Sequence, residues 1–164
     1  MFGITSASRY FEKVRADYAR VEADGADPDA ALNCILSLYH LHEWVWASWL
    51  KQRPAALLRL GIRKDIRSFK AWLDANCPHF DLVQELANGT KHCRPAHSTK
   101  HIKGYGRGPW GVGPFGAPYL LIDLGEENAP ASRYLVASTV LRAVVGFWIS
   151  FFATHGIVED AEPN

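Results

Sequence analysis

The stretch that most constrains the fold runs from Pro28 to Leu50 and is apolar on nearly all sides. A helix with one apolar stripe can lie on a surface, whereas a helix that is apolar all round has to be surrounded by other elements or by another subunit. Asp27 and Pro28 suit the start of this helix, because Asp caps helix N-termini and Pro is accepted at the first helical position. We therefore expect residues 28–50 to lie in the middle of a helical bundle or at a subunit interface.

This apolar stretch also carries two histidines and a glutamate, His40, His42 and Glu43. On a helix, Glu43 falls in line with Leu36 and Trp46. We therefore expect the Glu43 carboxylate to be at least partly buried, and a buried carboxylate has to be paired or protonated.

Other segments show the single apolar stripe that is typical of a helix packed on one side. The last helix is expected to begin at residues 128–130 and to end near His155, because Gly156 suits the left-handed position that follows a helix. The two most apolar helices, residues 28–50 and 130–155, should form the central pair of the bundle. Their surplus apolar surface predicts a homodimer. The remaining expected helices are residues 6–23, 63–76 and 80–93.

The segment from Tyr134 to Thr154 is nearly long enough to span a bilayer, and Arg142 is its only charge. An arginine near the middle of a membrane costs several kcal/mol, so we expect a buried core helix and no membrane association. Three widely spaced cysteines without a Cys-x-x-Cys pair, and the lack of a secretory signal, favour a cytoplasmic location.

Residues 104–118 contain six glycines and three prolines and cannot form a helix. Tyr105, Trp110, Phe115 and Tyr119 punctuate this segment, and we expect them to pack it against the bundle. A strand-like run follows at residues 119–124. The chain is therefore predicted to be mostly α, a single domain over residues 1–164. It should be a bundle of about five helices with a Gly/Pro/aromatic-rich arm or β-hairpin inserted before the last helix, at about residues 97–128.

Basic and aromatic residues alternate where this arm begins, with Lys100, Lys103 and Arg107 preceding Trp110. Such a pattern can pair with the phosphates and stack on the bases of single-stranded nucleic acid. The alternative, which the sequence favours, is a solvated arm whose aromatic rings are buried. The net charge of +1 argues against a broad electrostatic surface for nucleic acid.

Four polar residues form a column beside the apolar stripe of the helix at residues 80–93. The stripe consists of Leu82, Val83, Leu86 and Thr90. The column brings together carboxylates, an amide and an imidazole, although the exposed side of an amphipathic helix has the same pattern. Its members are Asp81, Glu85, Asn88 and His92.

The helical order and the segment Ala87-Asn88-Gly89-Thr90-Lys91-His92 resemble the HEPN (higher eukaryotes and prokaryotes nucleotide-binding) superfamily. Those proteins are helical bundles, commonly dimers, and many are metal-independent ribonucleases or toxin components. Asn88 and His92 match the family motif, whereas Ala87 stands where the family has arginine. A similar Asn-x-x-Lys-His segment, Gly/aromatic stretch and final apolar helix also occur in uncharacterised bacterial and phage-type proteins.

This resemblance implies roles for residues around the motif. His92 would be the general acid and base, Asn88 would orient the substrate, and Lys91 or Arg94 would hold a phosphate. The candidate residues for binding nucleic acid or another ligand are Arg94, Glu85, Lys100, Lys103 and Arg107.

Because the motif arginine is missing, we expect a protein without catalytic activity that dimerises and binds a partner protein or a nucleotide, including RNA, without a cofactor. One alternative is a metal-independent ribonuclease of the toxin or defence type that uses His92. Another is a metal-binding bundle that uses His40, Glu43 and His92, although a di-iron bundle would carry Glu-x-x-His pairs on two helices.

Overall fold

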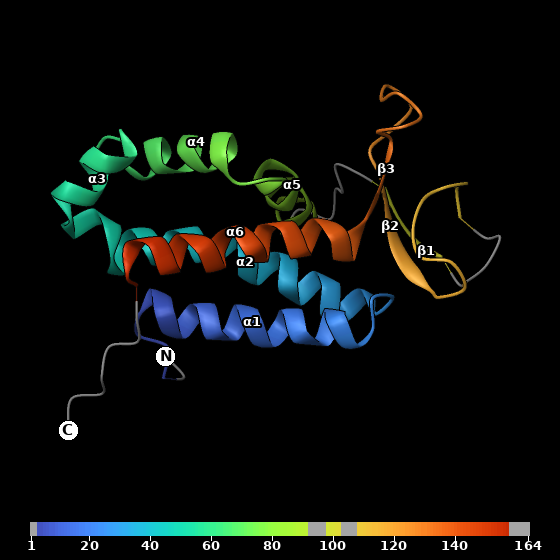
Figure 1. The fold of residues 1–164 in the computed structure, drawn as a ribbon, viewed down its shortest axis with the longest axis horizontal. Helices are drawn as coiled ribbons and strands as arrows, with labels where there is room; N and C mark the ends of the chain where they lie inside the picture. The colour runs from blue at the N-terminus through green and yellow to red at the C-terminus, as the bar shows by residue number, and fades with distance from the viewer. Residues whose placement is uncertain (1–2, 92–97, 103–107, 158–164) are drawn as a thin grey trace.

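The computed structural model describes residues 3–91, 98–102 and 108–157. The protein is mostly α, with a small sheet at one end of an elongated helical body, as predicted (Figure 1). The helices are α1 (Ala7–Ala23), α2 (Pro28–Ser48), α3 (Pro54–Leu60), α4 (Ile66–Asn76), α5 (Phe80–Lys91) and α6 (Ala137–His155), with a short 3-10 helix, η1 (Leu50–Gln52). The strands are β1 (Ser98–Ile102), β2 (Tyr119–Asp123) and β3 (Tyr134–Val136).

Local capping explains where the long helices begin and end. The Ser6 side chain accepts the backbone N–H of Arg9 at the start of α1. Asp27 caps α2, and its Oδ1 accepts backbone N–H groups at 2.9 and 3.1 Å. Gly156 follows α6 with a φ of 60°, which glycine adopts without steric cost. These predicted boundaries are confirmed.

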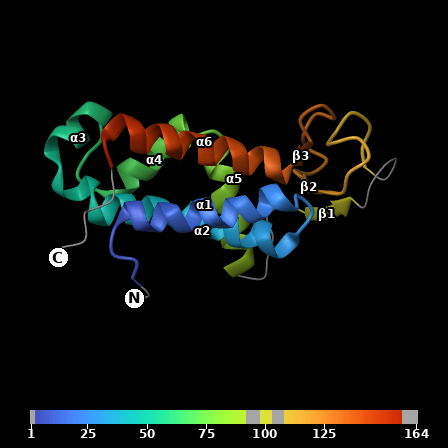
Figure 2. The ribbon, with the colours of Figure 1, turned by 60° about the horizontal axis from the view of Figure 1, so that its bottom comes forward.

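Helix α2 occupies the middle of the bundle, where it contacts α1, α4, α5 and α6. Its Leu38, Leu41 and Val45 are completely buried. Helix α6 runs alongside α1 and α2 (Figure 2) and brings the fully buried Trp148 into the same core. The most extensive contact of α2 is with α1, so the centre is α2 with its neighbours around it rather than a pair of α2 and α6.

The last helix begins at Ala137, so the expected start at residues 128–130 is wrong. The preceding residues form β3, which pairs with β2 so that Leu121 lies opposite Val136. Arg133 reinforces this pairing, because its guanidinium donates to both oxygens of the buried Asp123 carboxylate at 2.7 and 3.0 Å. The pairing partner lies more than ten residues away, and a local helix signal does not reveal it.

The sheet is antiparallel with the order β1-β2-β3, so the predicted hairpin is present with a third strand added. Strand β2 is in the centre, and all five of its residues are buried. Leu120 and Ile122 belong to the main core, whereas Tyr119 and Leu121 form a second small cluster with Val112 and strand β3. The sheet therefore joins the arm to the bundle.

The expectation that Glu43 is buried is also wrong, since its side chain is 54% exposed. Its neighbour His42 takes the buried place, at 3% exposed, and donates from Nδ1 to the backbone oxygen of Tyr39 at 2.5 Å. The neighbours of α2 leave one strip of this helix at the surface, and that strip contains His40 and Glu43.

Candidate functional site

The described part of α5 has the expected two sides. Leu82, Val83 and Leu86 are buried in the main core. Asp81 and Glu85 are exposed, and Asn88 is half-buried. His92 and Arg94 lie outside the described residues, and so do the side chains of Thr90 and Lys91.

Ala87, at the family's arginine position, is 4% exposed. Ala87 lies on the buried side of α5, as Leu86 does, whereas the carboxylates of this helix are exposed. The side chains that the structure describes on α5 provide carboxylates and amides but no cation. A phosphate would therefore have no positive partner among them.

The proposed metal ligands His40 and Glu43 lie next to each other, with Nδ1 of the histidine 3.1 Å from Oε2 of the glutamate. Both side chains are at the surface, and the third proposed ligand, His92, is outside the described residues. Within the described ranges no group of three His, Cys, Asp or Glu residues could hold a metal ion. Burial raises the pKa of the Cys34 and Cys77 thiols to about 12, so both are protonated at neutral pH and are weak ligands and nucleophiles.

Two of the four aromatic rings of the arm are exposed to solvent, which corrects for these two the expectation that they pack against the bundle; Tyr105 lies outside the described residues. Trp110 is 95% exposed and Phe115 is 81% exposed. One aromatic residue is sufficient to hold the arm in place, since Tyr119 is buried and donates its hydroxyl to the backbone oxygen of Val112 at 2.7 Å. Gly113 lies so close to this ring that a Cβ there would come within 2.4 Å of it.

Two short units of the same Gly-Pro-aromatic-Gly pattern lie in the arm, Gly-Pro-Trp-Gly at residues 108–111 and Gly-Pro-Phe-Gly at residues 113–116. The last glycine of each unit has a left-handed backbone, with φ of 75° at Gly111 and 80° at Gly116. In the first unit the Val112 N–H donates to the Pro109 oxygen at 3.3 Å, which closes a turn with Trp110 and Gly111 at its centre. This repeat was the sequence signal for the pair of rings, and it was not among the predicted features.

The arm also encloses a hollow of about 440 Å³, lined by its own residues. The arm projects beyond β2 at the end of the molecule farthest from α3 (Figure 1). Of the predicted ligand-binding cations, Lys100 belongs to β1 and pairs with Leu121 in the register, and Lys103 and Arg107 lie outside the described residues.

Charge is unevenly distributed along the chain, although the total is close to neutral. None of the 17 acidic residues lies between Leu86 and Ile122, whereas five of the 18 Lys and Arg residues do. This interval includes the end of α5, β1 and the arm. The near-neutral net charge therefore hides one strongly basic segment.

One helix among the described residues, α6, is long and apolar enough to cross a membrane, and 44% of its most apolar window is buried in the bundle. No protein-family model, curated protein or solved structure matches this chain.

Proposed function

We propose that the protein is a HEPN-like, non-catalytic binding protein whose arm binds single-stranded RNA. The observation that carries this proposal is the exposure of Trp110 and Phe115 at the tips of two identical Gly-Pro-aromatic-Gly units. Figure 1 shows the arm at the far end of the body, away from the helical core.

Two exposed rings on one short arm favour a binding role. Large aromatic side chains normally stabilise a protein because they are buried, whereas these two are 95% and 81% exposed. A proline precedes each ring and fixes its own φ, so the backbone next to each ring has less entropy to lose on binding. Stacking of a base on such a ring contributes about 1–3 kcal/mol, and it tolerates any base because every base has a π face.

The charge pattern favours nucleic acid over a protein partner. Lys100, Lys103 and Arg107 lie in the first part of the arm, before Trp110. The interval around them contains no acidic residue and would attract phosphate groups. An acidic residue in this interval would repel the nucleic acid backbone, and the interval contains none. Aromatic rings next to cations are the usual combination in proteins that bind single strands without sequence preference.

Ala87 supports the absence of catalysis. At this position the family has an arginine that would contact phosphate, and this chain has a buried methyl group. The binding function that we propose requires only affinity, so a missing guanidinium at the motif is compatible with it. His92 and Asn88 would then be remnants of the family motif rather than reacting groups.

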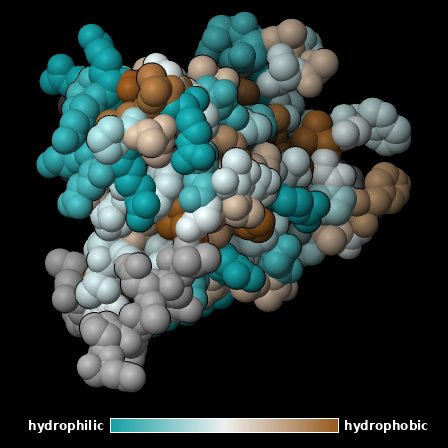
Figure 3. All heavy atoms as spheres, turned by 60° about the vertical axis from the view of Figure 1, so that its left-hand side comes forward, coloured by the Kyte–Doolittle hydropathy of each residue, from teal (hydrophilic) through white to brown (hydrophobic). Residues whose placement is uncertain are grey.

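Binding can be measured by the fluorescence anisotropy of a labelled single-stranded RNA of about 12 nucleotides. We expect Trp110→Ala and Phe115→Ala each to weaken the affinity about tenfold, which is about 1.4 kcal/mol. The matched control is Leu58→Ala, because Leu58 is 82% exposed on α3, away from the arm. The α3 end of the molecule carries mostly hydrophilic side chains, with apolar ones in separate small spots (Figure 3).

Two results would contradict the proposal. Equal affinity in the parent and both arm variants would show that the rings do not bind RNA. If the parent instead binds anionic lipid vesicles through the same two rings and ignores RNA, the arm is a membrane contact. An affinity for RNA that rises as the salt concentration is lowered would strengthen the nucleic acid assignment, because phosphate contacts release counterions.

The absence of catalysis needs a separate test. The labelled RNA is incubated with the parent and with His92→Ala in the presence of EDTA, and we expect neither to cleave it. Cleavage by the parent that the substitution removes would establish the alternative, a metal-independent ribonuclease that uses His92.

A further inference from the structure

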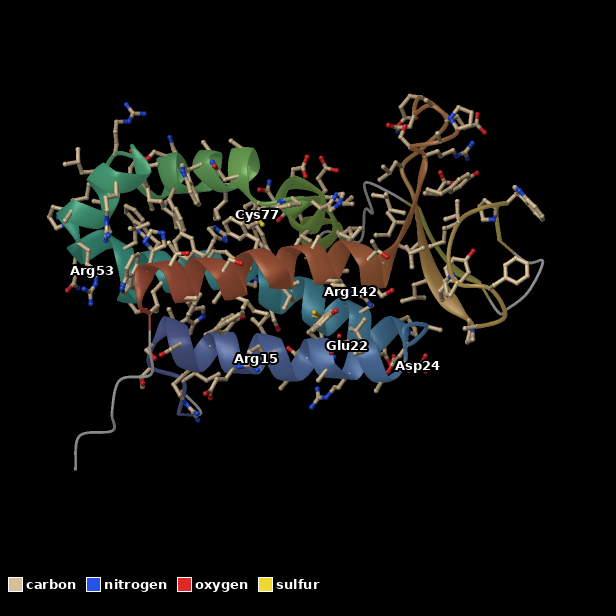
Figure 4. All side chains as sticks on the ribbon, viewed as in Figure 1. Arg15, Glu22, Asp24, Arg53, Cys77 and Arg142 are labelled. Atoms are coloured by element: carbon tan, nitrogen blue, oxygen red, sulfur yellow. The ribbon has the colours of Figure 1, made fainter. Side chains whose placement is uncertain are left out.

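A groove of about 520 Å³ runs between α1 and α6 on one side of the bundle. Its walls are small or apolar, with Ala16 and Ala19 from α1 and Val145 and Ile149 from α6. Ile149 is 50% exposed at the edge of the groove. Figure 4 shows α1 and α6 side by side, with Arg15 and Glu22 on α1 and Arg142 on α6.

The outward side of α6 has few charged or long side chains that would hinder close packing of another surface. Between Arg142 and His155 this helix has no charged residue. Gly146, Ser150 and Ala153 are exposed there together with Ile149, and none of the three has a long side chain. A helix this apolar that is less than half buried has surface to cover.

The charges around the groove are balanced and come from both helices. Glu12, Arg15 and Glu22 lie on one side of α1, at i, i+3 and i+10. Arg142 of α6 lies opposite them, with its Nε 3.4 Å from the Tyr18 hydroxyl, and Tyr18 also lines the groove. Two acidic and two basic side chains around one apolar groove are complementary to the same surface on a second copy.

This balance argues against other occupants. A bilayer would have to desolvate the charged side chains of the rim, which costs several kcal/mol for each charge placed deep in the membrane. An RNA would meet two carboxylates. A second copy related by a two-fold axis can place a basic side chain of each protomer against an acidic one of the other, because residue i contacts residue j and j contacts i in such an interface.

We propose that the α1–α6 groove is the homodimer interface, with the two α1 helices antiparallel and the two-fold axis near Ala19. Arg15 of each protomer then pairs with Glu22 of the other, and these residues lie about 10 Å apart along the helix, at about 1.5 Å per residue. Ile149 of each protomer contacts the groove of the other. This inference goes beyond the proposed RNA binding and does not depend on it, since the arm lies at the end of the bundle and the groove along its side.

The oligomeric state tests the interface directly. Sedimentation equilibrium of the parent should show a dimer at micromolar concentration. Ile149→Asp should weaken the dimer about tenfold to a hundredfold, because it places a charge where the proposed dimer would bury the half-exposed isoleucine. Ala19→Glu, on the opposite wall, should have a similar effect. Leu58→Asp is the control and should leave the dimer intact, although Leu58 is more exposed than Ile149.

A charge exchange tests the predicted pairing. Arg15→Glu alone places two acidic side chains opposite each other and should weaken the dimer. The double variant Arg15→Glu/Glu22→Arg should restore it, since the pair is re-formed with reversed signs. A circular dichroism spectrum shows that each variant is folded, and all of the substituted side chains are at least partly exposed.

Three results would overturn the inference. The first is a monomeric parent at high micromolar concentration. The second is a dimer that Ile149→Asp and Ala19→Glu leave unchanged. The third is a parent that is monomeric and binds vesicles through Ile149, which would make this side of the molecule a membrane surface. The RNA affinity of a monomeric variant is measured in a separate experiment. If the dimer interface is wrong, the proposed RNA binding can still be tested.

Discussion

The bundle and the arm use the same kind of side chain in opposite ways. In the bundle, Trp148 and Phe69 are completely buried, and Phe11 stacks on Phe152 with 4.4 Å between ring centroids. In the arm, Trp110 and Phe115 are almost fully exposed. The rings are of the same chemical kind in both regions, so the difference in their exposure comes from the backbone that carries them.

Helices place side chains on a common side every three or four residues, which lets rings from distant segments meet in one core. The arm lacks such a repeat, because its glycines and prolines exclude a helix, and Trp110 and Phe115 stay exposed. Tyr119, which belongs to β2, is buried and donates its hydroxyl to the Val112 oxygen, which ties the arm to the sheet. We infer that stability resides in the bundle and binding in the arm, and that the two can be changed separately.

The largest expected effect is on the bundle side of this comparison. Trp148→Ala should lower the free energy of unfolding by about 3–5 kcal/mol, because it removes a completely buried ring and leaves a cavity. Trp110→Ala, the matched change in the arm, should alter it by less than about 0.5 kcal/mol. Urea denaturation of both variants measures the difference. Similar losses in the two variants would show that the arm shares in the folding core.

Asp17 gives a smaller effect within the bundle. Its carboxylate is 5% exposed and accepts from the Ser37 hydroxyl at 2.6 Å and from the Lys13 ammonium at 2.5 Å. Asp17→Ala leaves these donors without their partner and should cost about 1–3 kcal/mol. Asp74→Ala, which breaks the more exposed pair with Lys70, should cost less than about 1 kcal/mol in the same denaturation experiment. Equal costs would mean that burial does not distinguish the two carboxylates.

Gly113→Ala should disturb the arm and leave the bundle folded. The new Cβ would lie within 2.4 Å of the Tyr119 ring, and the backbone φ of 83° adds strain, so we expect a cost of about 1–2 kcal/mol. Gly111→Ala has a similar φ with no atom within 4 Å of the added Cβ, so it isolates the strain from the clash. Hydrogen exchange at Val112 and Tyr119 reports the loosening. Faster exchange throughout α2 in Gly113→Ala would contradict the separation of the two regions.

The smallest effect concerns pH and the buried ring of His42. Burial lowers the pKa of His42 below the ordinary value of 6.5, although the hydrogen bond to Tyr39 opposes this. The unfolded chain therefore binds a proton that the folded protein does not, and stability is complete above about pH 6.5 and falls as the pH decreases below it. The loss should be about 1 kcal/mol or less between about pH 7 and pH 5.5, and His42→Phe should reduce it. His155, whose pKa burial also lowers, would keep part of the slope. A slope of opposite sign would contradict this assignment.

Helix boundaries were predictable from sequence wherever a single residue determines them. Asp27 and Gly156 act through their own side chain or backbone, and both predictions are confirmed. The start of α6 depended on β3 pairing with β2, which is a contact between distant residues. Glu43 was placed wrongly because periodicity shows which residues share one side of a helix but does not show which side the neighbours cover.

The candidate site was only partly predictable. The apolar stripe of α5 follows from helical spacing, and its Leu82, Val83 and Leu86 are buried as predicted. Trp110 and Phe115 each stand before a left-handed glycine, Gly111 or Gly116, and the prediction took the glycines as one run rather than as two units. The roles of His92 and Arg94 stay predictions.

One experiment tests the central claim most directly, and it uses the double variant Trp110→Ala/Phe115→Ala. Its affinity for single-stranded RNA and its free energy of unfolding are measured beside those of the parent. We predict an affinity about a hundredfold lower, about tenfold for each ring, and a free energy of unfolding within about 0.5 kcal/mol of the parent. Unchanged RNA affinity in a folded double variant would contradict the account.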